Sequence, residues 1–141
     1  MWRSRNYVVH VVEQCARFHI ICSERICAEG VAVFGPKINI DNLKKCLQTL
    51  KYIHHDFREK SIKCVNEPEF RAYIILLNLH NGSFISELRT LPPWIQISLE
   101  VKFAFEIYST LAMNYSKFFK LVRNTKFLNA CILLRYFNQV S

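Results

Sequence analysis

Apolar residues recur at every third or fourth position over much of the chain, and this spacing predicts amphipathic helices. The first predicted helix spans residues 7–28. The apolar stripe that we expect to face the core consists of Val8, Val11, Val12, Cys15, Phe18, Cys22 and Ile26. Gly30, Gly35 and Pro36 then break the pattern, which predicts an extended connection as far as Asp41.

A second helix is predicted to begin after Asp41, whose side chain is a suitable N-cap. Its apolar face consists of Leu43, Cys46, Leu47, Leu50, Ile53 and Phe57. A third helix starts near Asn66, which can cap it, because Pro68 fits the first turn and Glu69 can complete a capping box. This helix runs to about His80 and is apolar on nearly all sides, so we expect it to be central and buried.

The rest of the chain continues the helical pattern. We expect helices over 83–90, from Ser98 to about 113, over 117–124 and over 126–140, with a turn at Pro92-Pro93. No segment alternates with a period of two for long enough to predict a strand. The fold class is therefore all-α, with about seven helices in antiparallel hairpins. We expect one domain over residues 1–141, with residues 1–6 poorly ordered.

Composition supports an ordered chain and adds a strong positive charge. With 51% hydrophobic residues and three glycines, the chain is far from the composition of disordered proteins. The net charge of +8 favours anionic partners such as nucleic acid, acidic protein or charged lipid. Charged or amide residues interrupt every apolar run before it reaches the roughly 18 residues that span a bilayer. Six cysteines without a CxxC pair favour a reducing compartment, the nucleus or cytosol.

The sequence contains two clusters of residue types that can ligate metals. Cys15, His19 and Cys22 share one helical face and could ligate zinc, but no fourth ligand has suitable spacing. The alternative interpretation is two buried thiols beside a hydrogen-bonded histidine. His54 and His55 would point about 100° apart on a helix, which fits solvated surface better than a shared site. We expect no metal and no cofactor.

Motifs for catalysis are equally scarce. The sequence contains no GxSxG, P-loop, GxGxxG or HExxH segment. Glu67 and Glu69 are explained by helix capping, and Glu100 and Glu106 stand too far apart on a helix to cooperate on one face. We therefore expect a protein that is not an enzyme.

A basic stripe is the main candidate for contact with an anionic partner. It consists of Lys117, Lys120, Arg123 and Lys126, which lie opposite apolar residues on the predicted helix. These side chains could contact phosphates or an acidic partner. A charged stripe opposite an apolar one is also typical of a helix that simply faces solvent.

Four sequence blocks together resemble a known family. They are CARFHIIC (15–22), KINIDNLKKCLQTLKYIHHDFR (37–58), EPEFRAYIILLNLHNG (67–82) and SLEVKFAFEIYSTLAMNYSKFFKLVRNTKFLNACILLRYFNQV (98–140). They resemble the middle domain of the SAC/GANP family, and the resemblance covers most of the chain. It implies a tetratricopeptide-like, right-handed array of stacked helical hairpins. Family members continue from this domain into a winged helix, which we expect this chain to lack.

The resemblance also implies a function. Family members are scaffold subunits of a nuclear-pore-associated, transcription-coupled mRNA export complex. We therefore expect this chain in the nucleus, at the envelope or pore, and also in the cytoplasm. The implied partners are a winged-helix subunit of the proteasome-lid or signalosome type, a small acidic subunit, nuclear pore components and RNA. The alternative is an RNA-binding domain that acts through its basic surface.

Without a following module, the end of the helical array would expose an apolar face. We expect this face to dock a partner through Leu133, Leu134, Tyr136 and Phe137.

Overall fold

The described residues of the 141-residue chain are helical wherever they have regular structure. The structure is a computed structural model that describes residues 2–29, 34–79, 81–113, 120–121, 125–126 and 128–133. None of these ranges contains a strand, which confirms the all-α prediction. The chain folds as two compact units, one built on Met1–Cys64 and one on Val65–Leu133.

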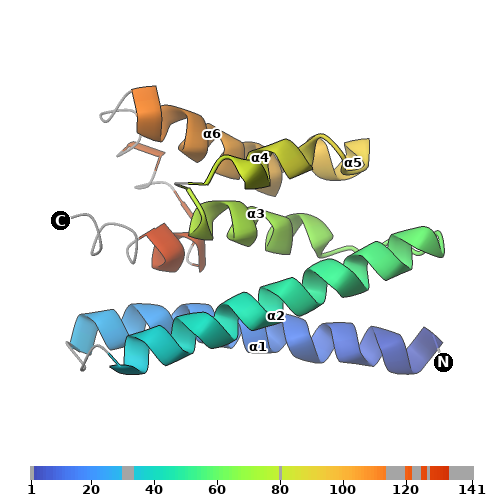
Figure 1. Ribbon diagram of the computed structural model, residues 1–141, viewed down its shortest axis with the longest axis horizontal. Helices are drawn as coiled ribbons and strands as arrows, with labels where there is room; N and C mark the ends of the chain where they lie inside the picture. Colours follow the sequence, from blue (N-terminus) through green and yellow to red (C-terminus); the bar gives the residue numbers. More distant parts are fainter. Residues whose placement is uncertain are drawn as a thin grey trace. The chain divides into compact units, whose positions relative to one another are not determined.

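The first unit is a hairpin of two long helices, α1 (Trp2–Glu29) and α2 (Phe34–Glu59). Figure 1 shows the two helices running side by side in opposite directions. Their buried apolar side chains are Val9, Ala16, Ile20, Ile40, Leu43, Leu47, Leu50 and Phe57. One polar pair also joins the helices: the His19 Nδ1 atom lies 2.8 Å from Asn39 Oδ1, and Asn39 Nδ2 donates to the His19 carbonyl oxygen at 2.8 Å.

The side of α1 that faces the core differs from the prediction. Val8, Val11, Cys15 and Phe18 are exposed. The buried positions are Val9, Glu13, Ala16, Ile20 and Ser23, which follow one another at helical spacing. Because α1 carries apolar residues on two sides, spacing alone does not say which side meets α2. The buried side includes the small Ala16 and Ser23, and small side chains let helix axes approach closely.

The beginning of α2 also corrects the prediction. Residues 34–40 belong to the helix, whereas the sequence pattern predicts an extended connection from Gly30 to Asp41. Pro36 lies in the first turn, where backbone N–H groups have no partner within the helix, so proline loses no hydrogen bond there. Most of the predicted apolar face of α2 is confirmed, since Leu43, Leu47, Leu50 and Phe57 are buried, whereas Cys46 and Ile53 are half-buried.

The second unit is arranged around α3 (Glu67–Leu77). This helix packs against α6 (Leu99–Met113) and contacts α4 (Ser83–Leu88) and α5 (Pro93–Gln96). Every residue from Phe70 to Leu77 is buried, as the nearly continuous apolar sequence predicted.

Helix ends in the second unit follow local signals, with some differences. Asn66 occupies the N-cap position of α3, but its side chain makes no capping hydrogen bond. Pro93 is the first residue of α5, so the predicted turn also begins a short helix. At the start of α6, the Val101 N–H donates to Ser98 Oγ at 3.4 Å, which agrees with the predicted start.

The last predicted helices are described only in part. Residues 120–121 and 128–133 are helical, and they fall within the predicted ranges 117–124 and 126–140. The other residues of those ranges lie outside the described part of the chain. The single domain and the tetratricopeptide-like stacking of the hairpins stay predictions.

Candidate functional site

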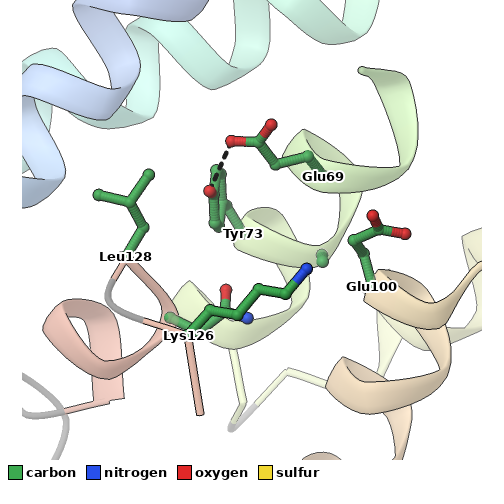
Figure 2. Close-up of a pocket in the computed structure, with 7 residues that line it drawn as sticks. Glu69, Tyr73, Glu100, Lys126 and Leu128 are labelled. Carbon is green, nitrogen blue, oxygen red and sulfur yellow. Dashed lines mark hydrogen bonds between the residues drawn. The ribbon is translucent and has the colours of Figure 1, made fainter. Parts of the chain in front are cut away.

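A pocket with a volume of about 280 Å³ opens in the second unit. Its lining residues are Glu69, Ala72, Tyr73, Glu100, Lys126, Leu128 and Asn129. Figure 2 shows that the labelled side chains come from three places: α3, α6 and the segment that carries Lys126. Ionisable and apolar groups that are far apart in sequence therefore surround one space.

On the α3 side, the position of a carboxylate is fixed by a core tyrosine. The Tyr73 hydroxyl donates to Glu69 Oε2 at 2.6 Å, one helical turn away (Figure 2). The Tyr73 ring packs edge-to-face against Phe70, with ring centroids 5.4 Å apart. Both rings are buried. The packed ring thus holds the Glu69 carboxylate at the wall of the pocket.

A second hollow, of about 370 Å³, adjoins the first along α6. It shares Glu100, Lys126 and Asn129 with the first pocket. Its other lining residues are Leu99, Lys102, Phe103, Glu106 and Thr125. Several pairs of the α6 members, such as Leu99 with Phe103, Glu100 with Phe103 and Lys102 with Glu106, are three or four residues apart, so the side chains share one broad side of the helix. The residues that line these two hollows are together called the α6 groove.

Two polar atoms of the groove are buried without a hydrogen-bond partner. The Ala130 N–H donates to the Lys126 carbonyl oxygen at 2.9 Å, so a helical turn begins here and places Asn129 one turn from Lys126. Asn129 is only 8% exposed. The Asn129 Oδ1 atom accepts no hydrogen bond within the described chain, and the Thr125 Oγ1 atom neither donates nor accepts one. Such atoms are costly to bury, so each indicates a place for a further partner.

The charge of the α6 groove is opposite in sign to that of the chain. Among the described residues, its ionisable side chains are three carboxylates, Glu69, Glu100 and Glu106, and two ammonium groups, Lys102 and Lys126. The whole chain carries +8. The groove is therefore a local acidic surface on a basic protein.

The predicted basic stripe is only partly described. Lys120 and Lys126 are both exposed. Lys126 also lines the α6 groove, together with Glu69 and Glu100. Carboxylates close to an ammonium group reduce its attraction for phosphate. Lys117 and Arg123 lie outside the described residues, so the stripe as a whole stays a prediction.

The predicted docking face at the end of the chain is represented by one described residue. Leu133 is fully buried, together with Cys131 and Ile132, so its side chain belongs to the interior and is not exposed. The apolar run from 131 to 133 explains this burial. Leu134, Tyr136 and Phe137 lie outside the described residues.

An exposed apolar surface occurs instead on α1. Its members, here called the α1 stripe, are Tyr7, Val8, Val11 and Phe18, of which Tyr7 is 72% and Phe18 61% exposed. Val8, Val11 and Phe18 belong to the stripe that the spacing predicts to face the core, so for them the prediction is wrong. Exposed apolar side chains that recur along one helix are typical of surfaces that bind other proteins.

The cysteine and histidine clusters do not form a common centre. His19 is hydrogen-bonded, as the alternative interpretation predicted, but Cys15 is exposed and Cys22 half-buried, so the prediction of two buried thiols is wrong. No three His, Cys, Asp or Glu side chains within the described ranges are placed to hold a metal ion. Burial raises the pKa of the Cys46 thiol, and the nearby Cys15 thiol raises it further.

The neighbouring histidines of α2 have different surroundings. His54 is buried, with 3% of its surface exposed, although solvated surface was predicted for it. His55 is exposed and lies 3.8 Å from Glu59 through its Nε2 atom. Adjacent positions on a helix point in different directions, which explains why one imidazole is inside and the other outside.

Sequence patterns gave little indication of the α6 groove. Helix capping accounts for Glu69 at the level of sequence. The spacing of Glu100 and Glu106 predicts that they do not share a helical face, yet both line the same hollow. The spacing of Leu99, Phe103 and Glu106 is a signal for a shared helical side. Asn129 carries no comparable signal, because its role depends on which helix packs next to it.

Comparison with known sequences identifies the class of protein. The SAC3/GANP family profile matches residues 3–141, and the chain therefore belongs to the SAC3/GANP family. This is the family that the sequence blocks resemble.

Within the described ranges, no helix is both long enough and apolar enough to cross a membrane.

Three curated relatives share most of this chain. It is 47% identical over 135 residues to Protein xmas of Drosophila melanogaster. The aligned region covers 94% of this chain and 6% of the Drosophila protein. It is 29% identical to SAC3 family protein 1 of Schizosaccharomyces pombe, over 91% of the chain and 14% of that protein. It is 30% identical to SAC3 family protein B of Arabidopsis thaliana, over 94% of the chain and 9% of that protein. The chain thus spans a small part of each relative.

Proposed function

We propose that the chain is a non-enzymatic scaffold module that acts in nuclear mRNA export by binding other proteins. The observation that carries this proposal is the family match, which extends over residues 3–141. The exposed α1 stripe supports protein binding, because covering exposed apolar side chains with a partner lowers the free energy of the complex. In this proposal the chain works within a transcription-coupled export complex at the nuclear pore.

The proposed partners are those that the family resemblance implies. They are a winged-helix subunit of the proteasome-lid or signalosome type, a small acidic subunit and nuclear pore components. The positive charge of the chain is suited to an acidic subunit, since opposite charges speed association and favour correct pairing.

The test is reconstitution with purified partners. The tagged 141-residue chain would be mixed with the winged-helix subunit and the acidic subunit from the same organism, and complexes would be separated by size-exclusion chromatography. We expect co-elution. The double substitution Val11→Ser and Phe18→Ser should weaken it, whereas Tyr52→Ser, at an exposed apolar residue on α2, is the matched control. A wild-type chain that elutes alone would refute the scaffold proposal.

Direct RNA binding is the other outcome that this test should examine. Affinity for a single-stranded RNA oligonucleotide would be measured by fluorescence anisotropy at several salt concentrations. Binding that persists at physiological salt without any protein partner would favour an RNA-binding domain over a scaffold.

A further inference from the structure

We propose that the Cys15 and Cys46 thiols are a peroxide-sensitive pair that forms a disulfide between α1 and α2. Cys15 is exposed on α1 and Cys46 is half-buried on α2, so an oxidant in solution can reach both sulfur atoms. This modification site goes beyond the proposed function, because its chemistry needs no protein partner.

A hydrogen-bonded contact fixes the register of the two helices. His19 Nδ1 lies 2.8 Å from Asn39 Oδ1, and Asn39 Nδ2 donates to the His19 carbonyl oxygen at 2.8 Å. Cys15 precedes His19 by four residues, and Cys46 follows Asn39 by seven residues. Residues at these spacings share a helical face. Because α1 and α2 run in opposite directions (Figure 1), both steps lead the same way from the contact and bring the two cysteines to one edge of the hairpin.

The positions along the helix axes are suited to a bond between the two sulfur atoms. With a rise of about 1.5 Å per residue, Cys15 lies about 6 Å and Cys46 about 10.5 Å from the hydrogen-bonded contact. Side chains tilt toward the N-terminus of their own helix. The Cys15 side chain therefore tilts away from the contact and the Cys46 side chain tilts back toward it, which reduces the offset of about 4–5 Å between them.

The ionisation of Cys46 agrees with this placement. Burial raises the pKa of the Cys46 thiol, and the charge of Cys15 raises it further. A like charge has such an effect at short range, so the second cause requires the two thiols to be near each other across the hairpin.

The other described cysteines are poorly placed for the same reaction. Along the helix axes Cys22 lies about 10 Å from Cys15 and about 15 Å from Cys46, whereas a disulfide needs Cα atoms within about 7 Å. Cys64 and Cys131 are buried and shielded from an oxidant in solution. Among the described thiols, Cys15 and Cys46 are therefore the suitable pair.

Hydrogen peroxide supplies the oxidising equivalents. The Cys15 thiolate attacks one peroxide oxygen, so that an S–O bond forms, the O–O bond breaks, hydroxide leaves and Cys15 becomes a sulfenic acid. The Cys46 sulfur loses its proton to solvent and attacks the Cys15 sulfur, so that the S–S bond forms, the S–O bond breaks and a second hydroxide leaves. The two hydroxides take up the two thiol protons as water. Thiol exchange reverses the bond in a reducing compartment, where disulfides are transient.

The test exposes the purified, reduced 141-residue chain to hydrogen peroxide. The remaining thiols are alkylated with iodoacetamide, and the chain is digested with trypsin without reduction. Cleavage after arginine and lysine leaves Cys15 in the peptide 6–17 and Cys46 in the peptide 46–51, each with a single cysteine. Mass spectrometry should find these two peptides joined as the main disulfide product, and dithiothreitol should separate them.

Folding and matched variants give the expected signs. In concentrated urea the preference for this pair should disappear, because the register of α1 and α2 is lost. Cys22→Ser removes a thiol from the same helix and should leave the yield unchanged, whereas Cys15→Ser should leave Cys46 unpaired. Circular dichroism reports whether each variant is folded.

The disulfide should also stabilise the folded chain. It closes the loop between residues 15 and 46 in the unfolded state, so the oxidised chain should unfold at a temperature about 5–10 °C higher than the reduced chain. Two results would overturn the inference: other cysteine pairs formed in equal yield by the folded chain, or an oxidised chain that unfolds no higher than the reduced one. Both leave the proposed function standing, because its reconstitution uses the reduced chain.

Discussion

At the scale of single residues, Tyr73 connects the core to the α6 groove. Its ring is buried against Phe70, while its hydroxyl holds the Glu69 carboxylate. Burial of a tyrosine is favourable when the hydroxyl finds a hydrogen-bond partner, and here that partner lies one turn earlier in the same helix. A packing residue therefore also positions a charged group of the candidate site.

Substituting Tyr73→Phe tests this role. The ring contact remains, but the 2.6 Å hydrogen bond to Glu69 is lost, so we expect the free energy of unfolding to fall by about 1 kcal/mol. Urea denaturation followed by circular dichroism measures the change. Tyr52→Phe, at a 65% exposed position on α2, should leave stability within the error of the measurement. Equal losses in the two variants would contradict the assignment.

The thiols provide a second test at this scale. Cys15 is exposed, whereas burial and the Cys15 thiol raise the pKa of Cys46 above its usual value. Because the thiolate is the reactive form, Cys46 should react more slowly than Cys15 at about pH 8. Its rate should continue to rise as the pH increases above the ordinary thiol pKa.

Iodoacetamide labelling followed by peptide mass spectrometry measures both rates. Cys64 and Cys131 are buried and serve as internal controls that should label only when the chain unfolds. If Cys46 were labelled as fast as Cys15 at neutral pH, the raised pKa would be wrong.

At the scale of elements, α1 shows that an amphipathic pattern can have two candidate faces. The face containing Ala16 and Ile20 is buried, and the face containing Val11 and Phe18 is exposed. Helical spacing of three and four predicted the helix correctly, but it selected the wrong side. Contact with α2 is what distinguishes the two faces.

The two faces should respond differently to truncation. Ile20→Ala removes a fully buried side chain and should destabilise the chain by about 2–4 kcal/mol through lost burial and the cavity left behind. Phe18→Ala removes a larger side chain that is 61% exposed, and we expect a change of at most about 1 kcal/mol. Denaturant unfolding compares the two variants directly. A larger loss for Phe18→Ala would mean that the predicted core face was correct.

At the scale of the whole molecule, the net charge of +8 does not apply to every surface. Lys126, for example, shares its surroundings with the carboxylates of Glu69 and Glu100. Total charge determines long-range attraction to anions, whereas local neighbours determine which side chains can contact a phosphate. A basic chain can therefore carry an acidic groove.

Salt dependence of RNA association separates these contributions. At low ionic strength a chain of this charge should associate with single-stranded RNA without sequence preference. Lys126→Ala should leave the slope of log K against log salt nearly unchanged, because its neighbours are carboxylates. Loss of one phosphate contact with a single strand would reduce the slope by about 0.7. Fluorescence anisotropy of the wild type and the variant measures both slopes, and a slope reduced by that amount in Lys126→Ala would assign Lys126 to the phosphate contacts.

The sequence by itself determined the fold class, the central α3 and the apolar face of α2. These features depend on local spacing and on residues such as Pro68 and Ser98, whose effects act within a turn of the chain. The family was also available from short sequence blocks, since the profile match extends over 3–141.

Only the tertiary structure decided which side of α1 is buried and which groups meet at the α6 groove. Both depend on packing between segments that are distant in sequence, so a local pattern contains no information on them. Glu69, Glu100 and Asn129 come from three separate segments and acquire a common environment only when α3 and α6 pack. Burial then gives Asn129 its unpaired oxygen, because desolvation is a property of the folded neighbourhood and not of the residue type.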